Sequence, residues 1–309
     1  MSLSGLRFYL SDPRRIYRFL SSRGMLNWMP DKLYLKMAFR ANTGKKLDLK
    51  NPKTFNETLQ WLKIYNRRLE YTTMVDKYEA KLYVAEKLGE EYIIPTLGVW
   101  ERFDDIDFDA LPDRFVLKCT HDSGGLVICR DKSKLDKEKA KRKIEKSLKN
   151  NYFWQGREWP YKNVKPRIIA EQYMEDESRN GLRDYKFFTF NGESKFLYLS
   201  EGLEDHTTAK ISFVGLDGKE MPFHRADYRP FDELPAMPAN FAEMTELSNR
   251  LAKEVGSPFV RCDFYSVDGR IYFSEITFTP CGGALPFEPA EWDEKLGDWI
   301  DLSSVKSAL

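Results

Sequence analysis

Two acidic residues near the end of the chain, Asp263 and Glu275, have the types and spacing expected of ligands for a divalent cation. They lie in two runs rich in β-forming residues, and the turn sequence Val267-Asp268-Gly269 between the runs predicts a β-hairpin. Because side chains alternate along a strand, both carboxylates can lie on one face of this hairpin. Mg²⁺ binds through one or two carboxylates together with phosphate oxygens and water, so the pair fits a metal bound to a nucleotide. The residues leave open a simpler alternative, in which the two acids pair with Arg261 and Arg270.

A second group suited to phosphate binding is Lys118 with the glycine-containing loop that follows it. Residues 114–118 and 126–130 are short apolar runs typical of strands, so Ser123-Gly124-Gly125 lies at the tip of a predicted hairpin. Backbone amides of such a loop can approach a phosphate closely, and a lysine ammonium group neutralises its charge. A solvent-facing lysine before an ordinary hairpin loop is the simpler alternative. A protein kinase is not indicated, because its glycine loop precedes the lysine strand.

The segment Glu171-Gln172-Tyr173-Met174, at the end of a third apolar run, and Asp184 beyond it are candidates for holding a nucleoside. A base needs an apolar slot with a few backbone and amide contacts, and a carboxylate can accept hydrogen bonds from ribose hydroxyls. Tyr173 and Met174 are also ordinary core residues, so this group gains weight only from its neighbours.

Other catalytic classes find less support in the sequence. Asp105-Ile106-Asp107-Phe108-Asp109 resembles the D-x-D of metal-dependent sugar-nucleotide transferases, although an acidic surface loop before Pro112 explains it more simply. The three histidines, His121, His206 and His224, lack metal-ligand spacing. Their spacing disfavours a zinc hydrolase, and no motif indicates a Ser-His-Asp enzyme.

The elements that must position these groups are helices interleaved with short strands. Thr54 and Glu57 have the spacing of a capping box at the start of a helix running to Arg68, and an apolar stripe predicts another helix from Tyr71 to Gly89. Further helices are expected at 134–150 and 241–255, and strands at 92–95, 114–118, 126–130, 167–173, 185–190, 194–199, 259–266 and 270–275. Helices mixed with largely antiparallel hairpins predict an α+β fold.

Composition indicates a globular protein whose charge is unevenly distributed. The 309 residues are 42% hydrophobic, too many for a disordered chain. We expect a protein of the reduced cytoplasm, because no run approaches the ~18 apolar residues of a membrane span, no signal peptide is evident, and the four cysteines form no C-x-x-C pair. The net charge of +1 argues against nucleic acid as a partner, yet residues 1–70 carry +10 and residues 71–309 carry −9. The basic segment suggests an interaction surface, or it simply pairs with the acidic remainder.

In their order along the chain, these groups resemble the ATP-grasp fold, the superfamily of D-alanine:D-alanine ligase and biotin carboxylase, over residues 71–285. The resemblance implies two α+β subdomains that clasp ATP, preceded here by an N-terminal helical segment. It implies that ATP is bound by Lys77, Lys118, Ser123, Gly124, Gly125, Glu171, Gln172, Tyr173, Met174, Asp184 and Lys186. It further implies that Mg²⁺ is bound by Asp263, Glu275 and Thr277, and that Arg261 and Lys118 act in catalysis. Thr277 departs from the pattern, because most members have an asparagine there and a threonine hydroxyl is a poorer ligand.

Nearly the whole chain resembles, more closely still, the TupA-like branch, named for a teichuronopeptide biosynthesis protein. The matching segments are Asn51-Pro-Lys-Thr-Phe-Asn-Glu57 with Trp61-Leu62, Asp184-Tyr-Lys-Phe-Phe188, and Glu275-Ile-Thr-Phe-Thr-Pro280 with Gly282-Gly283. Members of this branch are associated with bacterial surface polysaccharides and are often labelled glycosyltransferases, a label that these residues do not support.

The resemblance implies an ATP-dependent carboxylate–amine ligase that works through an acylphosphate and joins an amino acid or another amine to a uronic acid of a surface glycan. The alternatives are a kinase on the same fold, a glycosyltransferase using Asp105–Asp109, and a non-catalytic binding module. We expect three parts: residues 1–70, residues 71–174 with a small lid at 113–174, and residues 175–309 with the metal-binding hairpin. We expect no nucleic acid partner, and we expect residues 1–70 to contact a membrane-linked glycan at the inner face of the membrane.

Overall fold

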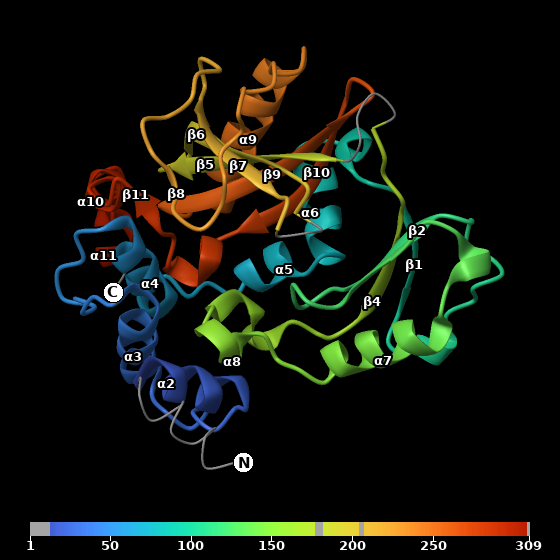
Figure 1. Ribbon diagram of the computed structural model, residues 1–309, viewed down its shortest axis with the longest axis horizontal. Coiled ribbons are helices and arrows are strands. Elements are labelled where there is room, and N and C mark those ends of the chain that lie inside the picture. The colour runs from blue at the N-terminus through green and yellow to red at the C-terminus, as the bar shows by residue number, and fades with distance from the viewer. Residues whose placement is uncertain (1–12, 177–181, 204–206, 308–309) are drawn as a thin grey trace.

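The computed structural model describes residues 13–176, 182–203 and 207–307, and its main features are two antiparallel sheets (Figure 1). The five-stranded sheet has the order β10 (Arg270–Thr277), β9 (Phe259–Val267), β5 (Arg183–Phe190), β6 (Glu193–Glu201), β7 (Lys210–Gly215). The four-stranded sheet has the order β1 (Thr96–Trp100), β4 (Ile168–Gln172), β2 (Phe115–Cys119), β3 (Leu126–Cys129). A small two-stranded sheet pairs β8 (His224–Arg225) with β11 (Phe287–Glu288).

Helices pack against both sheets (Figure 1). The α-helices are α2 (Pro13–Ser22), α3 (Asp31–Thr43), α4 (Phe55–Tyr65), α5 (Tyr71–Val75), α6 (Glu79–Lys87), α7 (Lys137–Leu148), α8 (Phe153–Gly156), α9 (Phe241–Val255), α10 (Trp292–Gly297) and α11 (Ser303–Lys306). Short 3₁₀ helices are η1 (Glu90–Tyr92), η2 (Phe103–Asp105), η3 (Lys132–Lys134), η4 (Trp159–Asn163) and η5 (Pro280–Gly283). The predicted α+β fold is confirmed.

Local sequence signals locate several elements correctly. The capping box at the start of α4 is present, since the Thr54 hydroxyl accepts from the Glu57 amide and the Glu57 carboxylate accepts from the Thr54 amide. The predicted turn between β9 and β10 also forms, with Asp268 and Gly269 at φ of 49° and 76°. Such left-handed positions suit a tight hairpin, so the turn sets the pairs from Arg270–Val267 to Phe273–Phe264. Beyond them the register shifts between Phe273 and Glu275.

Two predicted elements differ from the structure. The strand expected at residues 92–95 is wrong, because β1 starts only at Thr96. The single helix expected from Tyr71 to Gly89 is broken between α5 and α6, where the Asp76 carboxylate accepts hydrogen bonds from the amides of Tyr78 and Glu79. This local capping competes with helix continuation and leaves Lys77 in the link between the two helices.

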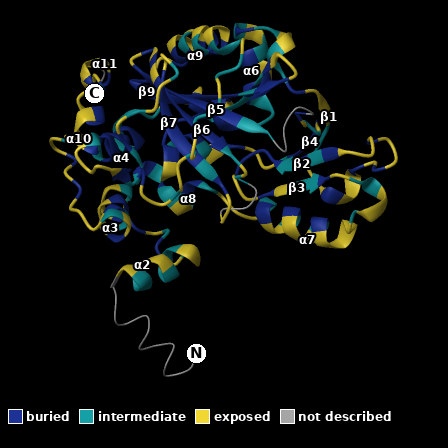
Figure 2. Ribbon diagram, turned by 45° about the horizontal axis from the view of Figure 1, so that its top comes forward, coloured by how far each residue is buried: buried dark blue, intermediate teal, exposed yellow. Residues whose placement is uncertain are grey.

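Three hydrophobic cores hold the molecule together (Figure 2). The first joins helices α2 to α4 to one face of the five-stranded sheet, with Phe55 packed against Phe259 at a ring distance of 4.8 Å. The second lies on the opposite face under α9, and the third lies between the four-stranded sheet and α7. Residues before 71 therefore share a core with residues after 175, while the predicted domain boundaries stay a prediction. Within the described ranges, no helix is long and apolar enough to span a bilayer.

Candidate active site

One face of the five-stranded sheet is apolar at one end of its strands and polar farther along them. On β9, Phe259 belongs to the core shared with the N-terminal helices, whereas Arg261 and Asp263 alternate onto the same face and are polar. The strand register sets Lys186 of β5 and Glu275 of β10 directly beside Asp263. Predicted residues from three strands thus form one row across the sheet.

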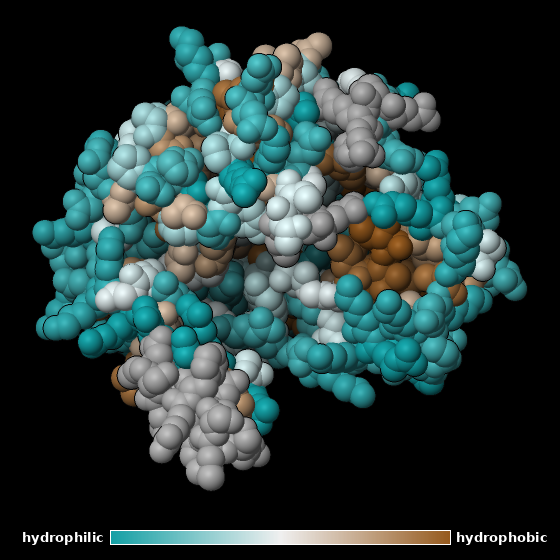
Figure 3. Space-filling view, viewed as in Figure 1, coloured by the Kyte–Doolittle hydropathy of each residue, from teal (hydrophilic) through white to brown (hydrophobic). Residues whose placement is uncertain are grey.

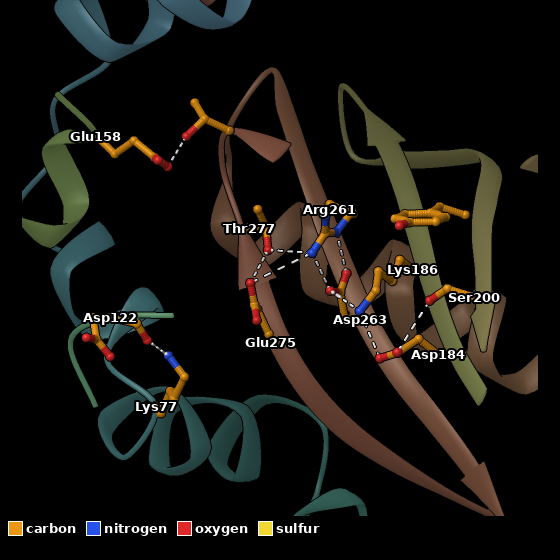
Figure 4. A network of polar contacts seen from close by, with 12 residues as sticks. Lys77, Asp122, Glu158, Asp184, Lys186, Ser200, Arg261, Asp263, Glu275 and Thr277 are labelled. Carbon is orange, nitrogen blue, oxygen red and sulfur yellow. Dashed lines mark hydrogen bonds and ion pairs between the residues drawn. The ribbon is translucent and has the colours of Figure 1, made fainter. Parts of the chain in front are cut away.

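Arg261 and Lys186 neutralise the buried acids of this row (Figure 4). Arg261 donates from Nε to Oδ1 of Asp263 at 2.7 Å and from Nη2 to Oδ2 at 2.6 Å. The Lys186 ammonium lies 2.8 Å from Asp184 Oδ1 and 3.4 Å from Asp263 Oδ2. Ser200 donates to the other oxygen of Asp184 at 3.3 Å. Because each acid has a basic neighbour, the group can stay ionised although Asp263 is fully buried.

Glu275 is the accessible acid of the group, with 43% of its side chain exposed. The Thr277 hydroxyl donates to Glu275 Oε1 at 2.6 Å, and Arg261 Nη2 lies 3.0 Å from the same hydroxyl. Burial by itself would raise the pKa of Glu275, but the surrounding positive charges, Arg261 first among them, lower it to about 2. The other two charges belong to Lys77 and Lys186. Glu275 is therefore a carboxylate at neutral pH.

The donors on these strands are of the types that bind a magnesium ion together with phosphate. Asp263, Glu275 and Thr277 offer two carboxylates and a hydroxyl on adjacent strands, and Mg²⁺ takes its remaining ligands from water and phosphate. Glu275 is accessible to such an ion, whereas Asp263 would have to exchange an oxygen that Arg261 or Lys186 now binds. Among the residues that the structure describes, no cluster of three or more His, Cys, Asp or Glu side chains is placed to hold a metal. The alternative in which the acids pair with arginines holds for Arg261, whereas Arg270 is exposed opposite Val267 at the hairpin turn. The assignment of these three ligands stays a prediction.

Lys118 and Glu171 face each other on neighbouring strands of the four-stranded sheet. Glu171 lies between two ammonium groups, with Lys118 Nζ 2.5 Å from Oε2 and Lys81 Nζ 2.6 Å from Oε1. Burial alone would raise the pKa of Glu171, but the charges of Lys118 and Lys81 lower it to about 2. The Lys118 side chain is 26% exposed and that of Lys81 only 6%, so Lys118 remains accessible to a phosphate. Lys81 of α6, one helical turn after Lys77, instead binds the second oxygen of the Glu171 carboxylate.

The glycine loop is anchored at its base and exposed at its tip. Lys77 donates from Nζ to the Asp122 carbonyl, and the Asp122 carboxylate accepts from the Gly125 amide at 3.0 Å. A Cβ on Gly125 would lie 2.5 Å from the Cys119 sulfur, so no larger residue fits there without a shift. Ser123 and Gly124 are exposed. The amides at the tip are therefore free to approach a ligand while the base stays fixed.

The predicted nucleoside segment lies at the end of β4, an inner strand of the same sheet. The Gln172 amide donates to the Pro95 carbonyl at 3.0 Å, and the Tyr173 hydroxyl accepts from Arg130 Nε at 3.1 Å. Tyr173 and Met174 are half-buried. The space-filling view shows hydrophobic side chains gathered over the strands of this sheet beside a hollow (Figure 3). Binding of a base at this segment, with Asp184 on the ribose, stays a prediction.

The acidic run Asp105–Asp109 lies away from this network. Its apolar members Ile106 and Phe108 are buried in the third core, and its acids are exposed. The Asp107 carboxylate accepts from the Asp109 amide at 3.0 Å, which is a turn-forming contact. This geometry explains the run as a surface loop.

Two buried charged residues near the site carry no signal in the sequence. Lys63 of α4 donates to the carbonyls of Gly156 and Gly282 at 2.9 Å and 2.7 Å, and Glu158 accepts from the Thr279 hydroxyl. Lys63 lies in the helix predicted from Thr54 to Arg68, and Glu158 lies outside all the predicted helices and strands. Only the tertiary contact with the segment after β10 reveals them.

Two antiparallel sheets, one carrying lysines and a glycine loop and the other a row of paired charges, define the class of ATP-grasp enzymes. The sequence matches the family described as TupA-like ATPgrasp over residues 57–301. The chain therefore belongs to the TupA-like ATP-grasp family, which confirms the predicted family.

Several solved structures are similar to this chain at low sequence identity. D-alanine–D-alanine ligase from Bacillus anthracis complexed with ATP is 15% identical, with a TM-score of 0.49 over 96% of this chain and 94% of that one. D-alanine–D-alanine ligase from Helicobacter pylori is 17% identical, with a TM-score of 0.41 over 82% and 69%. The ATP-grasp ligase PsnB, complexed with Mg, ADP and a variant of its minimal precursor, is 11% identical, with a TM-score of 0.44 over 82% and 65%. A search of curated protein sequences finds no match.

We expect Thr277→Val to weaken the response of the enzyme to Mg²⁺. The substitution removes the hydroxyl that lies between Arg261 and Glu275, so the carboxylate loses its orienting partner. Loss of such a partner typically costs 10–100-fold in metal affinity, and we expect the Mg²⁺ concentration for half-maximal ATP turnover to rise about 10-fold. Thr277→Ser keeps the hydroxyl and should behave like the wild type. An unchanged Mg²⁺ response in Thr277→Val would remove this residue from the site.

Proposed function

We propose that this protein is an ATP-dependent carboxylate–amine ligase that works through an acylphosphate, with a uronic acid of a bacterial surface polysaccharide as the carboxylate. The observation that carries the proposal is the row Lys186, Asp263 and Glu275 on one sheet, together with Lys118 and the glycine loop on the other. Asp184 raises the pKa of Tyr265 of β9 to about 12, and the charge of Lys118 opposes this shift. Lys118 on one sheet and Tyr265 on the other therefore lie within electrostatic reach of each other. The uronic acid is supported by the family name alone.

The side chains supply charge and position rather than a nucleophile. Lys77, Lys118 and the amides of Ser123–Gly125 neutralise and orient the phosphates of ATP. A carboxylate oxygen of the substrate attacks the γ-phosphorus, ADP leaves, and an acylphosphate forms. An amine then attacks the acyl carbon, and Arg261 stabilises the negative charge on the carbonyl oxygen. Mg²⁺, held by Asp263 and Glu275, would compensate the charge of the phosphate oxygens.

Trapping the intermediate tests this proposal. The protein is incubated with Mg-ATP, hydroxylamine and single members of a panel of uronic acids, amino acids and other small carboxylates. We expect one carboxylate to give equal amounts of ADP and hydroxamate. A panel that yields neither product would refute the ligase.

The same assay separates the rival activities. A kinase on this fold would leave phosphate covalently on its product, whereas a ligase releases it. A glycosyltransferase would bind a sugar nucleotide in preference to ATP, which a thermal shift measurement detects. ATP binding with no turnover on any substrate would indicate a binding module.

We further propose that the N-terminal helices contact an anionic membrane surface that carries the glycan, from the cytoplasmic side. Four large apolar side chains of this region are exposed: Trp28 by 76%, Met25 by 55%, Leu33 by 49% and Met37 by 39%. Exposed basic residues, among them Arg23, Lys32 and Lys36, lie in the same stretch. An aromatic and basic surface of this kind suits an anionic interface.

Vesicle sedimentation tests the membrane contact. We expect the protein to bind phosphatidylglycerol vesicles at low salt, to bind phosphatidylcholine vesicles weakly, and to lose binding as salt rises. Trp28→Ser with Lys36→Glu should reduce binding and leave hydroxamate formation unchanged. Equal affinity for the two lipids would contradict the proposal.

A further inference from the structure

A cavity of about 390 Å³ opens beside the candidate active site and reaches the N-terminal helices. Its lining includes Glu275 and Thr277 of β10 together with Phe39 of α3 and Lys63 of α4. The exposed Ser123 of the glycine loop also borders it. Ligand pockets commonly have volumes of roughly 300–1,000 Å³, so this cavity has room for a small molecule. The molecule inside it would lie next to the residues that we assign to the reaction.

The side chain of Glu158 is a buried acid at this cavity without a full set of partners. Glu158 is 7% exposed, and its Oε2 accepts a hydrogen bond from the Thr279 hydroxyl. Its Oε1 accepts no hydrogen bond from any residue that the structure describes. Burial raises the pKa of Glu158, and the charge of Lys63 opposes this effect. Within the described chain Lys63 forms no ion pair with it, because the lysine is committed to two carbonyls.

The surroundings of Glu158 favour a cation. The other charged groups that act on it are Lys63 and Glu275, one basic and one acidic, so its neighbourhood has no excess of positive charge. Tyr152 and Tyr161 line the same cavity with their rings 4.8 Å apart in a T-shaped arrangement, and aromatic faces attract ammonium groups. Figure 4 shows Glu158 on a segment across from the strands that carry Glu275 and Thr277. A carboxylate with a free oxygen in such a site calls for a positively charged partner.

We propose that this cavity is the acceptor pocket of the ligase and that Glu158 binds the ammonium group of the incoming amine. The assignment of a reaction step to this pocket rests on the proposed ligase function. An amine held at Glu158 faces the same cavity as Glu275 and Arg261, where the acylphosphate would form. The substrate class that fits is a small primary amine, such as an amino acid.

During amide formation the substrate ammonium group loses two protons, and Glu158 accepts the first of them. The ammonium group gives one proton to the Glu158 carboxylate and becomes a nucleophilic amine. Its nitrogen forms a bond to the acyl carbon, and the bond from that carbon to the phosphate oxygen breaks with its electron pair. The second proton of the nitrogen leaves with the phosphate, which yields an amide and inorganic phosphate.

Cys281 lines the cavity and is exposed, whereas Cys119, Cys129 and Cys262 are buried. Its reaction with an alkylating reagent can therefore report whether a ligand occupies the cavity. The rate at which iodoacetamide alkylates Cys281 can be followed by mass spectrometry of the full chain, with Cys281→Ser as the blank. The probes are ethylamine, glycine and L-glutamate, with ethanol and glycolate as matched analogues that lack the ammonium group. This measurement requires neither ATP nor turnover.

We expect at least one amine probe to slow alkylation of wild-type Cys281 by at least about twofold, and the alcohols to have no effect. Glu158→Gln should abolish the protection, and it should fold because burial already disfavours the charge at this position. Glu158→Asp keeps the negative charge, but its shorter side chain holds the carboxylate farther from the cavity. We expect this variant to weaken the protection of Cys281 as well. Exposed Glu291 provides the matched control, Glu291→Gln, with unchanged protection.

The outcomes separate this inference from the proposed function. Hydroxamate formation without protection by any amine would overturn the acceptor pocket and leave the ligase standing. Protection that persists equally in Glu158→Gln and Glu158→Asp would overturn the role of Glu158. Hydroxylamine is uncharged at neutral pH, so Glu158→Gln should still form hydroxamate while losing amide formation. An equal loss of both products would instead indicate a merely structural role.

Discussion

Glu275→Gln is expected to lower ATP turnover at least about 100-fold, because it removes a negative charge where metal-bound phosphate is to be neutralised. Glu275 lines the cavity, and its pKa of about 2 keeps it charged throughout the neutral range. The glutamine is isosteric and 43% of the original side chain is exposed, so unfolding free energy should change by less than about 1 kcal/mol. Turnover is measured as the release of ADP in the presence of the carboxylate substrate that the hydroxamate assay identifies.

The control for this variant is Glu193→Gln at the start of β6. Glu193 is exposed and pairs with Lys195 at 2.9 Å, far from the charged row along the strand. The activity of Glu193→Gln should therefore equal that of the wild type. Asp263→Asn is a less clean test, because Asp263 is fully buried and its loss leaves Arg261 without its partner. Full activity of Glu275→Gln would remove the metal assignment.

Glu171→Gln is expected to lower the free energy of unfolding by roughly 3–5 kcal/mol, the usual cost of removing one partner from a buried ion pair. Glu171 lies between Lys81 and Lys118, and without its charge two ammonium groups repel each other inside the protein. The variant should also bind ATP poorly, because Lys118 loses the contact that positions it. Chemical denaturation at neutral pH gives the stability difference.

The pH dependence of the difference in unfolding free energy between wild type and Glu171→Gln tests the same ion pairs. The pKa of Glu171 is about 2 in the folded protein, against an ordinary value of 4.5 for a glutamate in the unfolded chain, so the folded state stabilises the ionised form. This contribution, about 3 kcal/mol for a single group, is fully present above pH 4.5 and is lost as the pH falls toward 2. The stability gap between wild type and Glu171→Gln should therefore narrow in acid. A gap that stays constant would contradict the assigned ion pairs.

The matched control is Glu175→Gln, four residues along the chain. Glu175 also pairs with a basic residue, Arg114 at 2.5 Å, but both side chains are about half exposed. Exposed pairs typically contribute about 0–1 kcal/mol, so this substitution should change stability little at any pH. A loss similar to that of Glu171→Gln would show that burial is not the cause.

The hairpin of β9 and β10 was predictable because its turn follows from neighbouring residues. Asp268 and Gly269 define the turn. Regular alternation from this turn would pair Ser274 with Asp263, and it is an irregularity between Phe273 and Glu275 that brings Glu275 opposite Asp263. The phosphate loop was predictable for a similar reason, since β2 and β3 pair across Ser123–Gly125. Family resemblance then linked these local units in their order along the chain.

The sequence by itself determined the α+β fold, the turn between β9 and β10 and the lysine with its glycine loop, because hydrophobic patterning and turn chemistry are local properties. The irregularity after Phe273, which sets Glu275 beside Asp263, appears only in the structure. Only the tertiary structure decided that Lys81 rather than solvent covers the second oxygen of Glu171, and that Glu158 shares a cavity with Glu275. Such contacts join segments far apart in the chain. The first joins α6 to β4, and the cavity is lined by helices before Tyr71 that pack against the five-stranded sheet. No periodicity in the sequence encodes which distant surface a buried charge will meet.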